Sequence, residues 1–312
     1  MTRLVALFCM LALSAGGAGV EDVRGVFPPD VRTIGIASAS SLISRNALVA
    51  GTNLLCRAGY RVKVMPNVLK MEPADVRARL FEQAWLDPEI DFIIMSRGGH
   101  GASNVIDRVD WERLKSRKMR VMGFSDVTLV LGAMLSKGAG SPISGPMLGS
   151  LASGATKESC EWLRGVLGDG APPPLRLRPV KPCGAAVSGK PFGGLVSRFP
   201  VLLGKGLLPS FEGRVVFMEC TPRYAGVSES ILDGLAAKGL FDKAAAVVFC
   251  DFNREWEKPR VDALFAAFAA KVKCPVFAGF PYGHIPGSFA IDFTRPLSIS
   301  ADGVLEWKAR GK

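Results

Sequence analysis

Short apolar segments alternate with longer helical segments over the first half of the chain, and this alternation restricts the fold more than any other feature of the sequence. The short segments are rich in Val, Ile and Met, as buried strands are. Strands that alternate with helices favour a parallel sheet covered by helices on both faces. We predict strands at 33–37, 61–65, 91–95 and 120–124, and helices at 45–58, 72–85, near Trp111 and at 127–135.

The pattern changes after Leu167, where a stretch rich in Gly, Pro and basic residues begins. Such stretches often connect domains. Beyond it, short apolar runs separated by Gly and Pro turns predict a smaller, β-rich unit with strands at 214–220, 244–250, 275–278 and 289–291. Because 312 residues suffice for two domains, we predict an α/β domain at 25–165, a crossover linker at 166–190 and a β-rich domain at 191–312.

The N-terminus has the outline of a signal peptide. Arg3 precedes an apolar run from Leu4 to Leu13, and small residues follow up to Gly19. The run is too short to span a bilayer. We therefore expect residues 1–20 to be a removable leader and the protein to be periplasmic or otherwise exported, without stable membrane insertion. The alternative is an unusual first strand or helix, in a cytoplasmic protein.

Several classes of site are disfavoured by composition. The 39 Lys and Arg exceed the 28 Asp and Glu, but they are scattered and form no zinc finger, basic helix or RNP-type strand, so nucleic-acid binding is not expected. Only two histidines occur, which excludes a three-histidine metal site. The six cysteines outside the leader have no CxxC spacing, and we assign no pairs. No metal or other cofactor is predicted.

A serine follows directly after a predicted strand, in Gly123-Phe124-Ser125-Asp126, and a predicted helix begins immediately after it. A sharp strand-to-helix turn exposes the serine oxygen and directs helix amides at a developing oxyanion, as acyl transfer requires. The match to GxSxG is partial, because Val127 stands at the last position. The alternative is that Ser125 or Asp126 simply caps the helix.

The segment Arg97-Gly98-Gly99-His100 follows the strand at 91–95, at the edge where open α/β sheets bind ligands. Paired glycines let backbone amides approach a substrate closely. Arg97 has the fork geometry to pair with a carboxylate. The alternative is a tight turn with a solvated arginine.

An acid and a histidine in the second half complete the candidate residues. Glu219 lies in an apolar strand, where a partnered carboxylate can orient a histidine. His284 lies in a Gly- and Pro-rich loop, and catalytic side chains concentrate on such loops. The alternatives are a solvent-facing glutamate and an ordinary surface histidine, with His100 as the competing base. Their order along the chain does not identify a triad, because triads are defined by geometry.

In combination, these motifs resemble the LD-carboxypeptidase, or muramoyltetrapeptide carboxypeptidase, family of serine peptidases, which includes the microcin C immunity-type peptidases. The resemblance extends from about Val31 to Leu305. It implies a flavodoxin-like or Rossmann-like first domain and a β-rich second domain of barrel or swivelling type. The matching segments, in the family's order, are Asp87–Asp91, Arg97–Gly99, Gly123–Asp126, Gly193–Gly194, Phe217–Glu219 and Phe280–His284.

The resemblance also implies roles for individual residues. Ser125 would be the nucleophile, His284 the general base and Glu219 the residue that orients the base. The backbone amides of Gly99 and Asp126 would form the oxyanion hole.

Other positions around the implied site are expected to contact substrate. These are Arg97, Gly98 and His100, with Arg97 beside the terminal carboxylate. The family usually has Tyr and Asn where this chain has His100 and Leu195. We therefore expect the substrate pocket to differ in detail.

The implied reaction is hydrolysis of the L,D-peptide bond to the terminal D-alanine of murein tetrapeptides, in peptidoglycan turnover or recycling. A homodimer is expected by analogy alone. One alternative is an immunity-type peptidase that acts on peptidyl or aminoacyl adenylates, although a leader argues against that cytosolic substrate. The other is a catalytically silent wall-binding protein.

Overall fold

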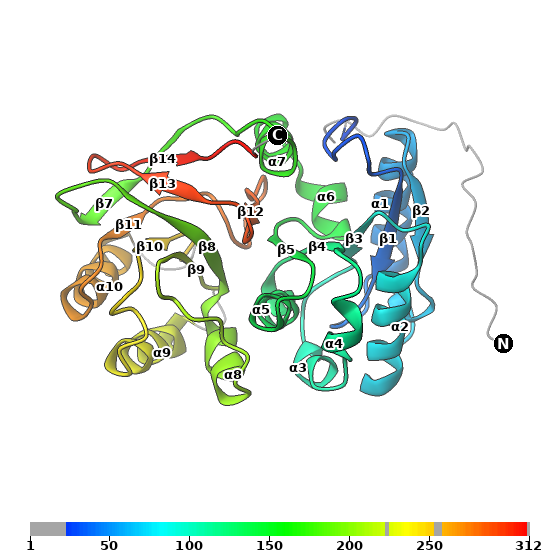
Figure 1. The fold of residues 1–312 in the computed structure, drawn as a ribbon, viewed down its shortest axis with the longest axis horizontal. Coiled ribbons are helices and arrows are strands. Elements are labelled where there is room, and N and C mark those ends of the chain that lie inside the picture. The colour runs from blue at the N-terminus through cyan, green and yellow to red at the C-terminus, as the bar shows by residue number, and fades with distance from the viewer. Residues whose placement is uncertain (1–22, 222–224, 253–257, 311–312) are drawn as a thin grey trace.

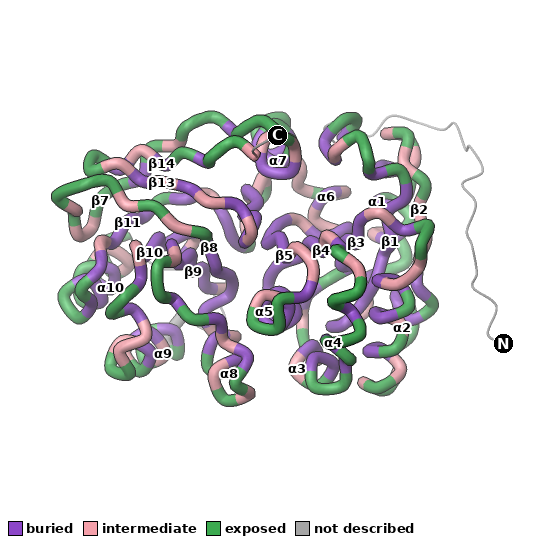
Figure 2. The backbone as a smooth tube through the Cα atoms, viewed as in Figure 1, coloured by how far each residue is buried: buried purple, intermediate pink, exposed green. Residues whose placement is uncertain are grey.

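Two lobes, each built on one β-sheet, lie side by side in the computed structural model (Figure 1). The structure describes residues 23–221, 225–252 and 258–310. The predicted leader at 1–20 lies outside the described residues. Buried backbone concentrates in the strands at the centre of each lobe (Figure 2).

The first lobe contains a six-stranded sheet in the order β12-β5-β4-β3-β1-β2, parallel except for β12. Every residue of β1 and β3 is buried, as helices on both faces require. The strands are β1 Thr33–Ala37, β2 Arg61–Val64, β3 Phe92–Met95, β4 Arg120–Gly123, β5 Ser141–Ser144 and β12 Ile291–Asp292. The helices are α1 Arg45–Arg57, η1 Pro66–Val68, α2 Ala74–Leu86, α3 Ala102–Ile106, α4 Trp111–Leu114, η2 Ser125–Val127, α5 Thr128–Lys137, α6 Leu148–Gly154 and α7 Lys157–Leu167.

The second lobe contains an eight-stranded sheet in the order β6-β14-β13-β8-β9-β10-β11-β7. Its centre, from β8 to β11, is parallel, and its outer pairs are antiparallel. The predicted fold class, a doubly wound α/β lobe with a β-rich partner, is confirmed. The strands are β6 Leu175–Arg176, β7 Arg178–Lys181, β8 Val187–Leu195, β9 Arg214–Glu219, β10 Ala246–Phe249, β11 Val276–Ala278, β13 Leu297–Ile299 and β14 Val304–Trp307. The helices are η3 Val196–Arg198, α8 Phe199–Gly204, α9 Ala225–Ala237 and α10 Lys258–Lys271.

The structure contains strands and a strand pairing that the sequence pattern did not indicate. The stretch expected as a linker carries β6, β7 and the start of β8. Pro179 lies in β7, which is an edge strand of the sheet, and edge strands tolerate proline. β12, from the second half of the chain, pairs antiparallel with β5 and so joins the first lobe's sheet. That pairing ties the two halves of the chain together and has no signature in either segment alone.

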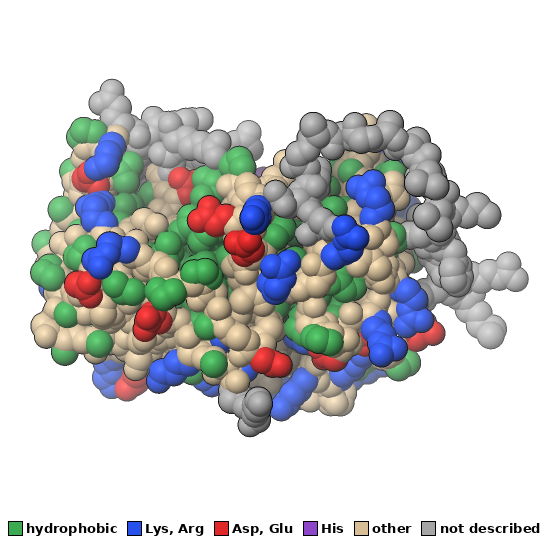
Figure 3. All heavy atoms as spheres, turned by 90° about the horizontal axis from the view of Figure 1, so that it is seen from above, with side chains coloured by type: hydrophobic (Ala, Val, Ile, Leu, Met, Phe, Trp, Pro, Cys, Tyr) green, Lys and Arg blue, Asp and Glu red, His purple; other side chains and the backbone are tan. Residues whose placement is uncertain are grey.

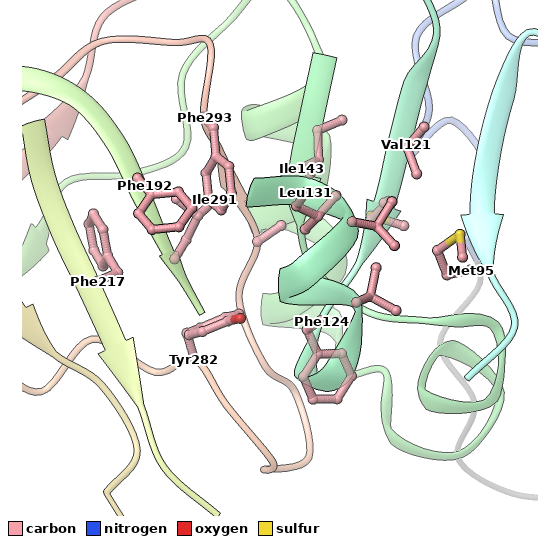
Figure 4. Close-up of a cluster of buried hydrophobic side chains, with 14 of the residues drawn as sticks. Met95, Val121, Phe124, Leu131, Ile143, Phe192, Phe217, Tyr282, Ile291 and Phe293 are labelled. Atoms are coloured by element: carbon pink, nitrogen blue, oxygen red, sulfur yellow. The ribbon is translucent and has the colours of Figure 1, made fainter. Parts of the chain in front are cut away.

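The junction between the lobes is tightly packed. Buried side chains from both sheets meet there, and Tyr282 directs its hydroxyl toward the first lobe (Figure 4). The Tyr282 hydroxyl is 2.6 Å from Ser144 Oγ, at the end of β5. At the end of β8, a Cβ on Gly194 would lie 2.3 Å from Thr128 Oγ1, and the Leu195 amide donates to that same oxygen at 3.1 Å. Only a glycine permits this approach.

Among the described residues, no helix is long and apolar enough to cross a membrane. On the face seen in Figure 3, Lys and Arg are spread over both lobes with Asp and Glu between them. Among the cysteines that the structure describes, Cys183, Cys220, Cys250 and Cys274 have thiols outside any disulfide.

Gly194→Ala is expected to lower the free energy of unfolding by about 2 kcal/mol or more, because the new Cβ overlaps Thr128 and the φ of 143° is strained for alanine. Urea unfolding measures the change. Gly204→Ala is the matched control, since nothing lies within 4 Å of its Cβ position at the end of α8. It should change stability by less than about 1 kcal/mol. Equal effects of the two variants would contradict the packing argument.

Candidate active site

Ser125 occupies a strained turn between β4 and α5. Its φ is 63°, and it is the one non-glycine residue with a positive φ in the part of the chain that the structure describes. Such strain is concentrated at functional sites and defines the strand-to-helix elbow of many nucleophiles. A Cβ on Gly98 would lie 2.9 Å from Ser125 Cβ and 3.1 Å from its Oγ. The glycine therefore keeps the space beside the hydroxyl open.

His284 links Ser125 to the second lobe. Its Nε2 lies 3.0 Å from Ser125 Oγ, and its Nδ1 lies 3.1 Å from Glu219 Oε2. The ring packs against Phe124, with 5.0 Å between ring centroids. The loop that carries His284 is held by a hydrogen bond of 3.0 Å from the Gly283 amide to Ser288 Oγ. The imidazole is thus fixed between two oxygens from different lobes.

Glu219 is completely buried at the end of β9. Burial raises the pKa of its carboxyl group above the ordinary value, while His284 and Arg198 act to lower that pKa and Asp251 to raise it. Its Oε1 has no hydrogen-bond partner among the described residues. The carboxylate therefore depends on His284, and on charge from Arg198, for its stabilisation.

The three side chains form one hydrogen-bonded series from hydroxyl to imidazole to carboxylate. Both contacts lie within the range in which a base takes a proton from a nucleophile and a carboxylate orients that base. The sequence singled out Ser125, Glu219 and His284, and the structure brings all three together. The arrangement is chemically able to perform acyl transfer. Among the described residues, no group of three or more His, Cys, Asp and Glu could hold a metal ion.

Asp126 follows Ser125, and its side chain is almost fully buried. Its Oδ2 accepts hydrogen bonds from Ser40 Oγ at 2.8 Å and from the Ala102 amide at 3.0 Å. Ala102 begins α3, directly after the glycine-rich loop at 97–101. Asp126 therefore holds this loop against the Ser125 turn, where the amides of Gly99 and Asp126 are predicted to receive an oxyanion.

Arg97 and His100 are the exposed residues at positions 97 and 100 of this loop. Arg97 Nη1 donates to the Leu42 carbonyl at 3.1 Å, and the His100 amide donates to Ser41 Oγ at 3.1 Å. The ring bound to Ser125 is that of His284, in the second lobe. Contacts of Arg97, Gly98 and His100 with a substrate remain predictions.

Sequence reasoning missed three neighbours of the site. Arg198 pairs with Asp126, Phe124 packs against His284, and Tyr282 anchors the histidine loop to Ser144. Phe124 and Tyr282 lay within the motifs, but only their contacts show what they do. Arg198 carries no signal in the sequence beyond following the glycine pair at 193–194.

A pocket of about 290 Å³ opens beside the histidine loop. It is lined by serine hydroxyls and apolar groups, and His284 contributes the one ionisable imidazole. Its wall includes Phe124, Ser150, Ser159, Leu163, His284 and Pro286.

Comparison with known proteins identifies relatives of the whole fold. The LD-carboxypeptidase N-terminal domain model matches residues 34–144, and the C-terminal domain model matches residues 188–299. A Streptomyces coelicolor protein that carries a carboxypeptidase name is 25% identical over 86% of this chain and 90% of its own. The murein tetrapeptide carboxypeptidase of Pseudomonas aeruginosa is 26% identical over 63% of this chain and 68% of its own.

Solved structures show the same architecture. The muramoyltetrapeptide carboxypeptidase of Oxalobacter formigenes superposes with a TM-score of 0.77 at 20% identity, covering 88% of this chain and 97% of its own. An MccF-like protein from Bacillus anthracis gives a TM-score of 0.80 at 16% identity, covering 91% of this chain and 99% of its own. At these identities the structures establish the shared fold, and the two domain models establish the family. The chain therefore belongs to the LD-carboxypeptidase family of peptidases.

Proposed function

We propose that this protein is a serine carboxypeptidase that hydrolyses the L,D-peptide bond to the terminal D-alanine of murein tetrapeptides. The observation that carries the proposal is the hydrogen-bonded series Ser125, His284 and Glu219, with contacts of 3.0 and 3.1 Å. The murein tetrapeptide carboxypeptidase of P. aeruginosa is a relative of this chain and supports the choice of substrate. The proposed setting is an exported enzyme of peptidoglycan turnover.

In the proposed mechanism, His284 Nε2 takes the proton of Ser125 as Oγ attacks the scissile carbonyl carbon. The backbone amides of Gly99 and Asp126 bind the resulting oxyanion. Glu219 accepts from Nδ1 and stabilises the imidazolium. The imidazolium then protonates the departing amine of D-alanine, and a water molecule activated by His284 releases the acyl group from Ser125.

A related structure favours one competing substrate. The microcin C7 self immunity protein MccF has been solved in complex with aspartyl sulfamoyl adenosine, and it shares this fold with a TM-score of 0.76 at 17% identity. An aminoacyl adenylate analogue therefore serves as the second substrate in the assay below. Cleavage of the analogue but not of the tetrapeptide would replace the murein assignment.

Wild-type protein should release D-alanine from a murein tetrapeptide, detected by mass spectrometry. Ser125→Ala and His284→Ala are each expected to lower kcat by about 10⁴-fold or more, because nucleophile and base act as one unit. His100→Ala should still release D-alanine, because its ring is not the one bound to Ser125. No cleavage of either substrate by the wild type would favour a silent wall-binding protein.

Glu219→Gln is expected to lower kcat and at the same time to stabilise the fold at neutral pH. Burial raises the pKa of Glu219 in the folded protein, whereas the pKa of a glutamate in the unfolded chain is about 4.3. Above the folded-state pKa, the buried charge costs free energy of folding; below about pH 4 the carboxyl is neutral in both states and the cost vanishes. The Tm of the variant should exceed that of the wild type at about pH 8, and the difference should shrink as the pH falls.

Glu212→Gln is the matched control for that stability experiment, because the Glu212 side chain is 65% exposed. Its Tm should follow that of the wild type at each pH. A Glu219→Gln variant less stable than the wild type at about pH 8 would show that the carboxylate stabilises the fold, contrary to the sign argued from its burial.

Arg97→Ala is expected to raise KM for the tetrapeptide by about 10-fold or more while kcat changes less, because a lost charge-assisted contact with the terminal carboxylate weakens binding. Steady-state kinetics of D-alanine release measure both constants. Arg45→Ala, an exposed arginine at the start of α1, is the control and should leave KM unchanged. An unchanged KM in Arg97→Ala would remove Arg97 from the substrate site.

A further inference from the structure

The proposed nucleophile and its base come from different lobes. Ser125 follows β4 of the first sheet, whereas Glu219 ends β9 of the second sheet and His284 lies on the loop after β11. The distance of 3.0 Å between Ser125 Oγ and His284 Nε2 therefore depends on how the lobes are placed relative to each other. Some contact beside Ser125 must fix that placement.

Asp126 is the residue where such a contact is made. Asp126 is 2% exposed as a residue. Its Oδ2 accepts hydrogen bonds from the Ser40 hydroxyl and the Ala102 amide. Oδ1 lies 2.9 Å from Arg198 Nε, which comes from η3 of the second lobe. The charge of Arg77, in the first lobe, also interacts with this carboxylate. The Arg77 Nη1 itself donates a hydrogen bond to the Ala39 carbonyl at 2.8 Å. Asp126 thus joins three segments directly behind the nucleophile.

The pair formed by Asp126 and Arg198 is shielded from solvent. The two side chains are 3% and 14% exposed. Arg198 Nε–H makes no hydrogen bond among the described residues, so the attraction is Coulombic. Removing one partner of such a pair leaves the other charge buried without its counter-charge, which is costly.

The segment that leads to Arg198 also lies beside Glu219. The close approach at Gly194 and the hydrogen bond from Leu195 to Thr128 seat the end of β8 against the start of α5. β8 also pairs in parallel with β9, and in that pairing Leu195 lies opposite Glu219. The chain then turns through η3 and reaches Arg198. One short segment therefore contacts the nucleophile turn and is in register with the proposed orienting acid.

We propose that Arg198 is a positioning residue, whose ion pair with Asp126 locks the Ser125 turn of the first lobe in register with the Glu219 and His284 pair of the second. Arg198 touches no reacting atom in this role. It acts by holding Oγ and Nε2 at hydrogen-bond distance. This inference rests on the proposed function of Ser125 as a nucleophile, but it does not depend on which peptide is the substrate.

Two measurements on folded protein test the proposal: kcat and KM for D-alanine release, and the rate at which a fluorophosphonate probe labels Ser125. Arg198→Met should lower kcat and the labelling rate about 10- to 100-fold, with KM within about threefold of the wild type. Arg198→Lys should recover at least about tenfold of that loss, because it restores the charge. A role in stability alone would not produce this split at temperatures well below Tm.

Substitution of Asp126, the partner of Arg198, gives an independent test. Asp126→Asn keeps an oxygen for Ser40 and Ala102 but removes the charge, and should also lower kcat. The double variant Asp126→Asn/Arg198→Met should be about as slow as Arg198→Met alone, because both changes break one interaction. Lys205→Met is the control: it removes another ion pair between the lobes, with Asp107, on more exposed side chains, and should leave kcat unchanged.

Three results would overturn the proposal: kcat of folded Arg198→Met within about twofold of the wild type, multiplied losses in the double variant, or equal losses in Lys205→Met. If Arg198→Met does not fold, Arg198→Lys and Asp126→Asn carry the test. Failure of the proposed function is distinguishable. Wild-type protein that is labelled at Ser125 but leaves the tetrapeptide intact has a different substrate, and the labelling rates still test Arg198.

Discussion

The hydrogen bond between Ser125 and His284 crosses the junction of two separately organised lobes, and much of the surrounding structure keeps that junction closed. β12 crosses from one half of the chain to the other, Tyr282 binds Ser144, and Gly194 allows β8 to touch α5. These contacts lie around the site rather than in it. An active site built from two lobes gains room for a substrate between them, but it requires this rigidity to keep the reacting groups within hydrogen-bond distance.

Strain and close packing are concentrated on the first lobe's side of the site. Ser125 adopts a φ of 63°, which a serine tolerates only when its surroundings impose it. Those surroundings are the buried strand before it, the helix after it and the carboxylate of Asp126 beside it. Gly98 lets the glycine-rich loop approach Ser125 closely, because any side chain there would collide with Ser125. The close approach of Gly98 and the strained backbone of Ser125 occur in the same turn.

The second lobe contributes a completely buried carboxyl group to the site. Glu219 is ionised for its proposed role although burial raises its pKa, and the compensating charges are the imidazolium formed in the reaction and the guanidinium of Arg198. The fold therefore gives up stability where the chemistry needs a carboxylate. Arg198 also pairs with Asp126, so one cation acts on both the Ser125 turn and the buried carboxyl group of Glu219.

The sequence by itself determined the alternating strands and helices of the first lobe, the β-rich second lobe and the family, and it pointed to Ser125, Glu219 and His284 as candidate site residues, because local periodicity and short motifs are encoded within a few residues. It did not reveal β12 in the first sheet, the strands within 166–190, or the roles of Arg198 and Tyr282. Those features depend on pairings between residues far apart in the chain, such as Tyr282 with Ser144 and Arg198 with Asp126. Only the tertiary structure decided them, since a single segment carries no record of the partner it will meet.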